Sequence, residues 1–268
     1  MKKQMVTIYR AERFSPNSVE KDRFILDAVV ACLHPWADIY RMSEDLWNDE
    51  QFRSIPKDLV LSMARSSHVL GVLSQEGCPV VNTPQGVRKA SSRRMVHQAM
   101  SHLQLPFPPS SGDDGYWLKR ADMSAQSADD VQFLRTESQL AEAIRALKEK
   151  KISDFVVSAH VKGDLIKFYG VRHTPFFRYG YPTDLGQTKF GLEQYNGRAH
   201  HYAFSVDQLR TDVDRLAEEL EVDVYGGDCI VREDGSYCLI DFNDWPSFSW
   251  CQKEAAEAIA ELVKQSWI

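Results

Sequence analysis

Hydrophobic and polar residues follow one pattern in the first hundred residues and another beyond them. In the first stretch, short apolar runs alternate with segments in which apolar residues recur every three or four positions, which is the helical period. The apolar runs predict strands and the periodic segments predict helices, at these positions: strands at 5–10, 39–42, 58–63 and 79–82, helices at about 18–33 and 66–75. Such alternation of strand and helix predicts a parallel sheet with helices on its faces.

A break follows the next predicted helix, Ser91–Leu103. Three prolines in the following six residues and a Ser-Ser-Gly-Asp-Asp-Gly stretch end the helix and mark a domain boundary. Beyond the break the pattern predicts these elements: strands at 116–120, 155–161 and 165–171, helices at about 138–150, 211–220 and 254–264. Strands that follow one another with few helices between them indicate an antiparallel α+β arrangement.

The most specific pattern lies near the C-terminus, where two apolar runs, 224–232 and 237–243, flank the sequence Glu-Asp-Gly-Ser. Asp-Gly between apolar runs favours a hairpin, because a type I′ turn needs positive φ at both central residues. We therefore predict a type I′ turn at Asp234 and Gly235, and this turn fixes the register of the two strands.

In that register three oxygen-bearing side chains share one side of the hairpin. Asp228 is expected opposite Asp241, with Cβ atoms roughly 5 Å apart, and Asn243 points to the same side. Like charges opposite each other destabilise a hairpin, and a bound cation removes that cost. Two carboxylates and an amide are hard ligands that suit Mg²⁺, or Mn²⁺ in its place, shared with phosphate oxygens. The alternative is an exposed sheet face with two solvated acids.

Composition narrows the classes of function. The 268 residues are 43% hydrophobic and 26% charged, ordinary for a globular protein with two or three subdomains. A net charge of −6 argues against nucleic acid as the main partner. Five cysteines without a CxxC motif indicate buried thiols in a reducing compartment, not a disulfide framework or a zinc ribbon. We expect a cytoplasmic protein without a membrane partner, because no apolar run approaches the length of a span and Met-Lys-Lys-Gln leads into a strand.

Several stretches resemble the ATP-grasp superfamily. Val-Val-Asn-Thr-Pro at 80–84, with the basic helix and the Leu-Pro-Phe-Pro that follow it, is similar to the linker that ends the family's N-terminal domain. Residues 116–119 resemble the strand that bears a phosphate-binding lysine, and 155–170 resemble the adenine hinge and its next strand. The most specific piece is Ile-Asp-Phe-Asn-Asp-Trp-Pro at 240–246. The resemblance is to the glutathione-synthetase-like branch, which includes ribosomal-modification-type glutamate ligases and inositol tris/tetrakisphosphate kinases.

The resemblance implies an ATP-grasp fold that combines α/β and α+β parts. It places a parallel-sheet domain at 1–107 and an ATP-grasp domain at 108–268. The latter would have one subdomain at 108–160 and another, with the metal site, at 161–268. ATP and Mg²⁺ are the implied cofactors, and ATP would be clasped between the two subdomains. Neither the residues nor the resemblance indicates an oligomeric state.

The same resemblance assigns the nucleotide contacts. Lys119 would offer a compact cation to the phosphates, together with Arg93 or its neighbour Arg94, and 122–130 would form a flap over them. Many relatives have glutamate in place of the alanine at the hinge, and a backbone contact survives that change. The hinge and ribose contacts would come from these residues: Ala159, His160, Val161 and Asp164.

Further positive charge points to an anionic substrate. Lys167 lies in an apolar strand, where a charge is costly unless it is paired or reaches water, and the inositol kinases have a lysine at the matching place. Residues 172–202 interleave cations with aromatic residues and contain few acids, which predicts an acceptor or phosphate site unless the segment is a solvated basic loop. We therefore expect Lys167, Arg172 and Arg178 in the catalytic group. Three residues after the first strand are candidates for substrate contacts: Arg10, Ser15 and Asn17.

The function that the resemblance implies is an ATP-dependent ligase, which phosphorylates a small-molecule or peptide carboxylate for attack by an amine or a thiol. The alternative is a kinase that passes the γ-phosphate to a hydroxyl of an anionic, inositol-phosphate-like acceptor with the same ATP apparatus. A third interpretation is an ATP-binding module without catalysis. The intact set of two aspartates and one asparagine counts against that third interpretation.

Overall fold

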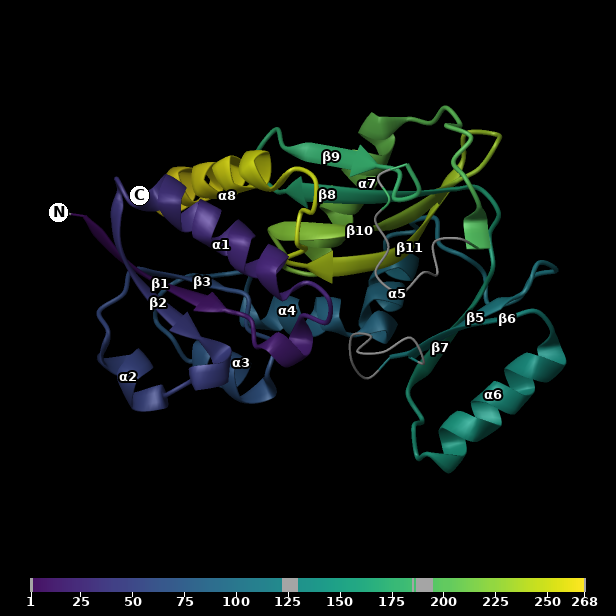
Figure 1. The fold of residues 1–268 in the computed structure, drawn as a ribbon, viewed down its shortest axis with the longest axis horizontal. Coiled ribbons are helices and arrows are strands. Elements are labelled where there is room, and N and C mark those ends of the chain that lie inside the picture. Colours follow the sequence, from purple (N-terminus) through teal and green to yellow (C-terminus); the bar gives the residue numbers. More distant parts are fainter. Residues whose placement is uncertain (1, 122–129, 185, 187–194, 268) are drawn as a thin grey trace.

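The structure, a computed structural model, describes residues 2–121, 130–184, 186 and 195–267. Three sheets are arranged along an elongated molecule, and both ends of the chain lie at the same end of it (Figure 1). The combination of a parallel sheet with two antiparallel sheets confirms the predicted mixture of α/β and α+β parts. Among the described helices, none is both long enough and apolar enough to cross a membrane.

The first sheet is parallel, with strand order β2-β1-β3-β4. The predicted strands and the two predicted helices of this region are confirmed, whereas α2 and two short 3₁₀ helices were not predicted. The elements are β1 (Lys3–Tyr9), η1 (Glu12–Phe14), α1 (Val19–Leu33), β2 (Ala37–Ser43), η2 (Glu44–Leu46), α2 (Asp49–Ser54), β3 (Leu59–Ser62), α3 (Ser67–Leu73) and β4 (Val80–Val81).

Two helices connect this sheet to the rest, α4 (Pro84–Ser91) and α5 (Arg93–His102). The sequence analysis anticipated α5 but not α4. Thr83 caps α4 by accepting a hydrogen bond from the N–H of Gly86 at 2.9 Å. Pro84 is the first residue of the helix, a position at which a backbone N–H has no acceptor within the helix, so the missing N–H of proline costs nothing. Gly86 is required by packing, because a Cβ there would lie 2.2 Å from the carbonyl oxygen of Glu221.

The second sheet has the order β6-β5-β7 and the third has the order β11-β10-β8-β9, both antiparallel. Strands β6 and β9 fall in stretches for which no strand was predicted, because each is short and of mixed polarity. The elements are β5 (Tyr116–Arg120), β6 (Val131–Leu134), α6 (Glu137–Glu149), β7 (Phe155–Ala159), β8 (Asp164–Val171), β9 (Phe177–Gly180), α7 (Val206–Glu219), β10 (Val224–Val231), β11 (Tyr237–Asp244) and α8 (Gln252–Trp267).

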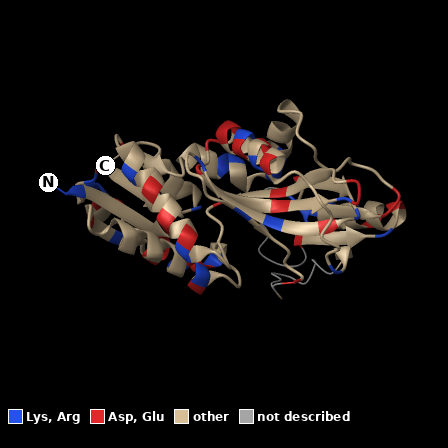
Figure 2. Cartoon of the chain, turned by 90° about the horizontal axis from the view of Figure 1, so that it is seen from above, with Lys and Arg blue, Asp and Glu red and all other residues tan. Residues whose placement is uncertain are grey.

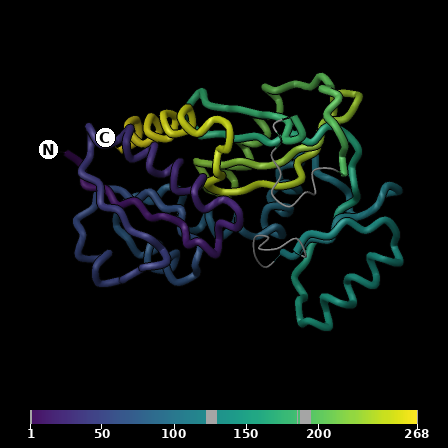
Figure 3. Tube along the Cα trace, in the orientation of Figure 1, coloured from purple at the N-terminus to yellow at the C-terminus, as the bar shows by residue number. Residues whose placement is uncertain are grey.

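The last helix returns to the beginning of the chain. Figure 3 shows the yellow α8 beside the purple α1, and buried residues of both belong to one apolar core with β1, β3 and Val224 of β10. A second core lies between α5, α7 and the other face of the β8–β11 sheet. The predicted boundaries at 107 and 160 fall in the connections between α5 and β5 and between β7 and β8.

The hairpin of β10 and β11 is confirmed, but its predicted turn is wrong. The N–H of Gly235 donates to the carbonyl of Arg232 at 3.0 Å, and Gly235 has φ +80°, whereas Asp234 is not left-handed. The turn is therefore a longer loop, not a type I′ turn, and it shifts the strand register by one residue. A bulge at Ile240 removes that shift, so that Asp228 still pairs with Asp241.

Candidate active site

A cavity of about 470 Å³ lies where the three sheets come together. Three parts of its lining are named below. The aromatic end is formed by Trp117, Val131, 158–161, Leu165, Asn196 and Ile230. The charged middle is formed by Arg93, Lys119, Lys167, Asp228, Asp241 and Asn243. The polar end is formed by Arg10, 14–15, 17–18, 21–22, Arg65, Tyr169 and 244–249, without Phe248.

The charged middle is built on a row of residues that cross the third sheet in register. Lys167 of β8 pairs with Asp228 of β10, and Asp228 pairs with Asp241 of β11. The Lys167 ammonium lies 2.9 Å and 3.2 Å from the two carboxylate oxygens of Asp228. This ion pair explains how a lysine is accommodated in an apolar strand. Red and blue bands are visible on the strands of this sheet as well as on the helices (Figure 2).

Asp241 is surrounded by cations. Burial raises the pKa of its carboxyl, but Arg93, Lys119, a hydrogen bond with Asn243 and Lys167 together lower the pKa below its ordinary value. The group is therefore ionised at neutral pH, as a ligand of a cation must be. Lys119 of β5 and Arg93 of α5, which were expected at the phosphates, are the two cations that lower its pKa most.

Lys119 comes from the second sheet and reaches across to the third. Its ammonium donates to the carbonyl of Ile240, the bulge residue, at 3.0 Å. Burial lowers the pKa of Lys119, and Arg93 lowers it further, while Asp241 and Asp228 act in the opposite direction. Of the two candidate arginines, Arg93 lines the cavity.

The neighbouring Arg94 points elsewhere. Its guanidinium hydrogen-bonds to the carboxylate of Asp154, outside the cavity, at 2.9 Å from Nε. Arg93, by contrast, hydrogen-bonds to the carbonyl of Arg120 and faces the charged middle. The geometry therefore favours Arg93 over Arg94 for a role in the cavity.

The donors of the charged middle fit a divalent metal that is shared with a ligand. Within the described ranges, no group of three or more histidine, cysteine, aspartate or glutamate residues is arranged to hold a metal. Asp228, Asp241 and Asn243 supply two carboxylates and one amide, which leaves part of an octahedral Mg²⁺ shell for phosphate or water oxygens. In this structure the Lys167 ammonium is ion-paired with the Asp228 carboxylate. A metal ion at Asp228 would share that carboxylate with the ammonium or displace the ammonium.

The aromatic end is lined by backbone groups that are already partly hydrogen-bonded within the protein. The N–H of Ala159 donates to the carbonyl of Pro109 at 2.7 Å, and the N–H of His160 donates to the carbonyl of Gly115 at 2.8 Å. The amide of Asn196 donates to the carbonyl of Val161 at 2.9 Å. A base bound at this end would have to hydrogen-bond to backbone groups other than the N–H groups of Ala159 and His160.

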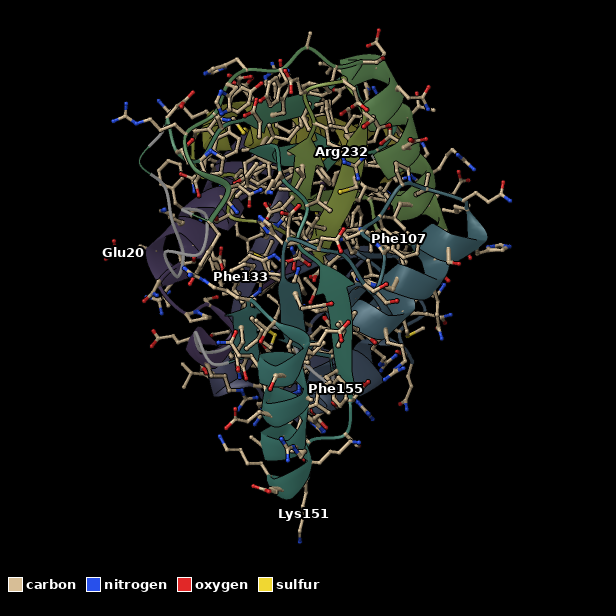
Figure 4. The ribbon with its side chains drawn as sticks, turned by 90° about the vertical axis from the view of Figure 1, so that its right-hand side faces the viewer. Glu20, Phe107, Phe133, Lys151, Phe155 and Arg232 are labelled. Carbon is tan, nitrogen blue, oxygen red and sulfur yellow. The ribbon has the colours of Figure 1, made fainter. Side chains whose placement is uncertain are left out.

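Four rings gather at this end. Trp117 packs against Phe133 and Tyr195, with ring centroids at 5.1 Å and 5.5 Å, and His160 packs against Phe133 at 5.3 Å. The indole N–H of Trp117 donates to Nδ1 of His160 at 3.1 Å. Burial lowers the pKa of His160, so the ring is neutral and accepts this bond. In Figure 4 Phe133 lies between the bulk of the molecule and the projecting helix α6.

The polar end is held by a buried network of ion pairs. Arg10 donates to Asp22 at 3.0 Å and to the carbonyl of Trp245 at 2.9 Å. Arg65 contacts Asp244 at 2.6 Å. The predicted substrate-contact residues Arg10, Ser15 and Asn17 all line this end of the cavity. The guanidinium of Arg10 is occupied by protein groups, however, so its role here is to position the turn that begins at Trp245.

Three predicted site residues do not reach the cavity. Arg172 pairs with Asp223 at 3.2 Å, and Arg178 pairs with Glu254 at 2.6 Å. Asp164 is buried, and its two carboxylate oxygens accept the backbone N–H groups of His200 and Tyr202, at 2.6 Å and 2.8 Å. None of the three is among the lining residues, so the catalytic role expected for the two arginines and the ribose contact expected for Asp164 find no support in this geometry.

Other lining residues were not anticipated by the sequence analysis. Arg65 follows β3 at the same edge of the parallel sheet at which Arg10 follows β1, so the rule that ligands bind at the carboxyl ends of strands would have found it. Lys21, Tyr169, Ser247 and Ser249 carried no motif. The expected flap over the phosphates lies, apart from Asp130, outside the described residues, as does Lys189 of the basic segment.

The sequence matches no family model and no curated protein at the significance required, but solved structures resemble the fold over its whole length. D-alanyl-alanine synthetase A from Vibrio cholerae O1 biovar eltor is 12% identical, with a TM-score of 0.70 and coverage of 99% of this chain and 98% of that one. A RimK domain ATP-grasp protein from Sphaerobacter thermophilus is 15% identical, with a TM-score of 0.63 and coverage of 97% and 99%. D-alanine–D-alanine ligase from Bacillus anthracis in complex with ATP is 12% identical, with a TM-score of 0.63 and coverage of 98% of each chain. The chain therefore has the ATP-grasp fold, as the sequence resemblance implied.

Proposed function

We propose that the protein is an ATP- and Mg²⁺-dependent ligase that activates a substrate carboxylate as an acylphosphate and joins it to an amine or a thiol. The observation that carries the proposal is the charged middle of the cavity, where three cations and two carboxylates meet between an aromatic end and a polar end. The aromatic end suits a nucleobase, and the polar end leaves room for a second reactant. The ligases among the structural neighbours support the same class of reaction.

In the first step, an oxygen of the substrate carboxylate attacks the γ-phosphorus of ATP, and the bond between the γ-phosphorus and the β,γ-bridging oxygen breaks to release ADP. Lys119, Arg93 and Lys167 would hold the phosphate oxygens and offset the negative charge that develops on them. Asp228, Asp241 and Asn243 would hold Mg²⁺, which, when bound, neutralises charge on the transferred phosphoryl group.

In the second step, the amine or thiol attacks the carbonyl carbon of the acylphosphate, phosphate leaves and the nucleophile loses its proton. The side chains of the cavity position the reactants, and no nucleophilic side chain of the protein is needed. The polar end would receive the reactant that is not the nucleotide. Because its lining is rich in hydroxyl and ionic groups, a polar substrate fits better than a large apolar one.

A kinase is the second candidate. It would use the same nucleotide groups, but it needs cations for a phosphorylated acceptor, and Arg172 and Arg178, which were expected in that role, form ion pairs outside the cavity. The ligase is therefore favoured. The two are separated by adding candidate carboxylates to Mg-ATP with and without an amine. Phosphate release that depends on the amine supports the ligase, and a stable phosphorylated acceptor formed without an amine supports the kinase.

Replacement of one metal-site carboxylate tests the nucleotide assignment. Asp241→Asn should lower turnover at least about 100-fold, because a ligand charge for the cation is lost, while the free energy of unfolding stays close to that of the unchanged protein. ADP release and calorimetric titration with Mg-ATP measure the effect. Asp154→Asn, the same change at an acid outside the cavity, is the matched control and should keep nearly full activity. Full activity of Asp241→Asn would refute the metal assignment.

A further inference from the structure

The strand β2 forms one edge of the parallel sheet. It pairs with β1 along its whole length, Ala37–Ser43, and within the described ranges no strand pairs with its other side. The carbonyl of Tyr40 accepts a hydrogen bond from the hydroxyl of Thr7 of β1 at 3.3 Å, so the backbone groups of Tyr40 face β1. Because backbone groups alternate in direction along a strand, those of Ile39 and Arg41 face outwards. The edge therefore offers a donor and acceptor pattern to which another strand can bind.

Large apolar side chains are exposed around this edge. The exposed fraction is 48% for Tyr40 in the middle of β2, 51% for Trp36 just before it and 81% for Leu46 beyond its end. Phe24 is 47% exposed and belongs to α1, which packs on the opposite face of the sheet from the Tyr40 ring. The strand has neither a proline nor a bulge, which are common protections of an exposed edge. Apolar surface around an unprotected edge indicates an interaction site.

The charges of β2 restrict how a second copy of the strand can pair with it. A two-fold axis makes the two strands antiparallel and sets residues of the same sheet face opposite each other, so one residue of β2 meets its own copy on the axis. If that residue were Asp38, two carboxylates would face each other, and if it were Arg41, two guanidinium groups would do so, which destabilises a sheet. A pairing centred on Tyr40 avoids both repulsions, and it alone pairs all seven residues of β2.

The same pairing brings the exposed apolar residues together. The two Tyr40 residues form a non-hydrogen-bonded pair, the closer of the two kinds of antiparallel pair, in which side chains contact each other. Trp36 lies before the strand and Leu46 lies after it, so Trp36 of one copy and Leu46 of the other lie at the same end of the paired strands. The surface is thus complementary to itself, as a two-fold interface requires.

We infer that β2 is the interface of a symmetric dimer, in which two copies of the chain join their parallel sheets into one continuous sheet. Backbone hydrogen bonds between Ile39 of one copy and Arg41 of the other hold the strands together, and the exposed aromatic residues are covered on both faces. None of residues 37–43 lines the cavity. The inference therefore goes beyond the proposed ligase and does not depend on it.

The mass of the particle in solution tests whether the dimer forms. Sedimentation equilibrium of the unchanged protein should give about twice the chain mass of 30.7 kDa. Tyr40→Lys sets two ammonium groups opposite each other on the axis and should raise the dissociation constant of the dimer at least about tenfold. Tyr179→Lys, the same change at an exposed tyrosine of the edge strand β9, is the matched control and should leave that constant unchanged. Urea unfolding checks that both variants fold.

Cysteine substitutions test the register. Copper phenanthroline and oxygen oxidise two thiols to one disulfide, and oxygen takes up the two electrons and two protons. In Tyr40→Cys the two thiols face each other, whereas in Asp38→Cys the two substituted positions are roughly 14 Å apart along the strands, too far for a disulfide. Non-reducing electrophoresis should show cross-linking at least about tenfold faster for Tyr40→Cys. The unchanged protein, which keeps the partly buried Cys32, gives the background.

Three results would overturn the inference. The first is an unchanged protein that stays monomeric at its highest soluble concentration, which would leave the edge to an extended segment of another protein. The second is a dimer whose dissociation constant is the same in Tyr40→Lys and Tyr179→Lys. The third is equal cross-linking of Tyr40→Cys and Asp38→Cys. If Tyr40→Lys does not fold, the comparison of the two cysteine variants decides the outcome.

Discussion

The β8–β11 sheet is joined to the rest of the molecule on two sides, and the two joints differ in construction. Towards the first sheet, α8 buries six residues against α1 and its neighbours, in a core that contains Trp245. Beyond the second joint, the helix α6 packs on β5 and β6 of the small sheet and buries only Leu147. Figure 4 shows α6 projecting away from the body, with Lys151 at its tip.

Polar contacts follow the same division. In the first joint, the side chain of Asn82, which is 1% exposed, accepts the N–H groups of Asp223 and Val224 and donates to the carbonyl of Val224, all at 2.8 Å. In the second joint, Lys119 donates to the carbonyl of Ile240 and the exposed Arg94 pairs with Asp154. The polar end thus lies in a stiff, buried joint, while Lys119 and the aromatic end are carried by a unit that is held less firmly.

The largest effect is expected at the buried network of the first joint. Arg10→Met should lower the free energy of unfolding by about 4 kcal/mol, because Asp22 stays buried without its cation and Asp244 keeps Arg65 alone. Urea unfolding measures the change. Arg23→Met removes an exposed arginine that pairs with Glu12 and should cost less than about 1 kcal/mol. Equal losses in the two variants would contradict the view that this joint is stabilised by buried charge.

Asn82 tests the same joint through hydrogen bonds. Asn82→Ala should lower the free energy of unfolding by about 3 kcal/mol, since it leaves buried backbone groups at the start of β10 without a partner. The control is Asn48→Ala, which removes an exposed cap of α2 whose side chain accepts the N–H of Gln51, and should cost about 1 kcal/mol. Thermal and urea unfolding of both variants give the comparison. A smaller loss at Asn82 than at Asn48 would show that the first joint does not depend on this residue.

The second joint should respond weakly. Arg94→Gln removes an exposed pair with Asp154, in which the arginine side chain is 54% exposed, and should change the free energy of unfolding by less than about 1 kcal/mol. Hydrogen exchange in α6 is the more sensitive measurement and should become faster in this variant. A loss comparable to that of Arg10→Met would mean that the two joints are equally strong.

The smallest effect concerns pH. Burial lowers the pKa of folded His160 below the ordinary 6.5, with Lys162 adding to the effect and Asp114 opposing it. As the pH falls through 6.5, the unfolded chain takes up a proton that the folded chain does not, so the free energy of unfolding decreases. His160→Gln should remove this part of the pH dependence between pH 7.5 and 5. An unchanged pH profile would show that His160 does not titrate differently in the two states.

Sequence patterns could predict the first sheet and the hairpin because both depend on local periodicity, which the chain shows clearly. Asp228 and Asp241 were placed opposite each other correctly, but a wrong turn and an unforeseen bulge compensated for each other. A bulge depends on how a strand packs against its neighbours, which a single sequence does not reveal.

The errors at the site have a common cause. Arg172 and Arg178 belong to a basic segment, but composition does not tell on which side of a sheet a charge emerges or which acid it meets in the fold. Arg65 and Ser247 were missed because their role depends on residues far away in the chain. Lys167 lines the cavity in an ion pair with Asp228, which agrees with the expectation that an isolated charge within an apolar strand needs a partner.

The bulge at Ile240 has a consequence for how such proteins tolerate changes in length. If the strands ran without the bulge, the loop register would set Asp228 against Ile240 and Asp241 against Gly227, where the ring of Phe168 lies 2.5 Å from the position a Cβ would take. The one-residue bulge therefore decides whether the Asp241 carboxylate faces the cavity or the apolar core on the other face of the sheet. A change of one residue in the length of the connecting loop can be compensated by such a bulge, provided that the bulge lies between the loop and Asp241.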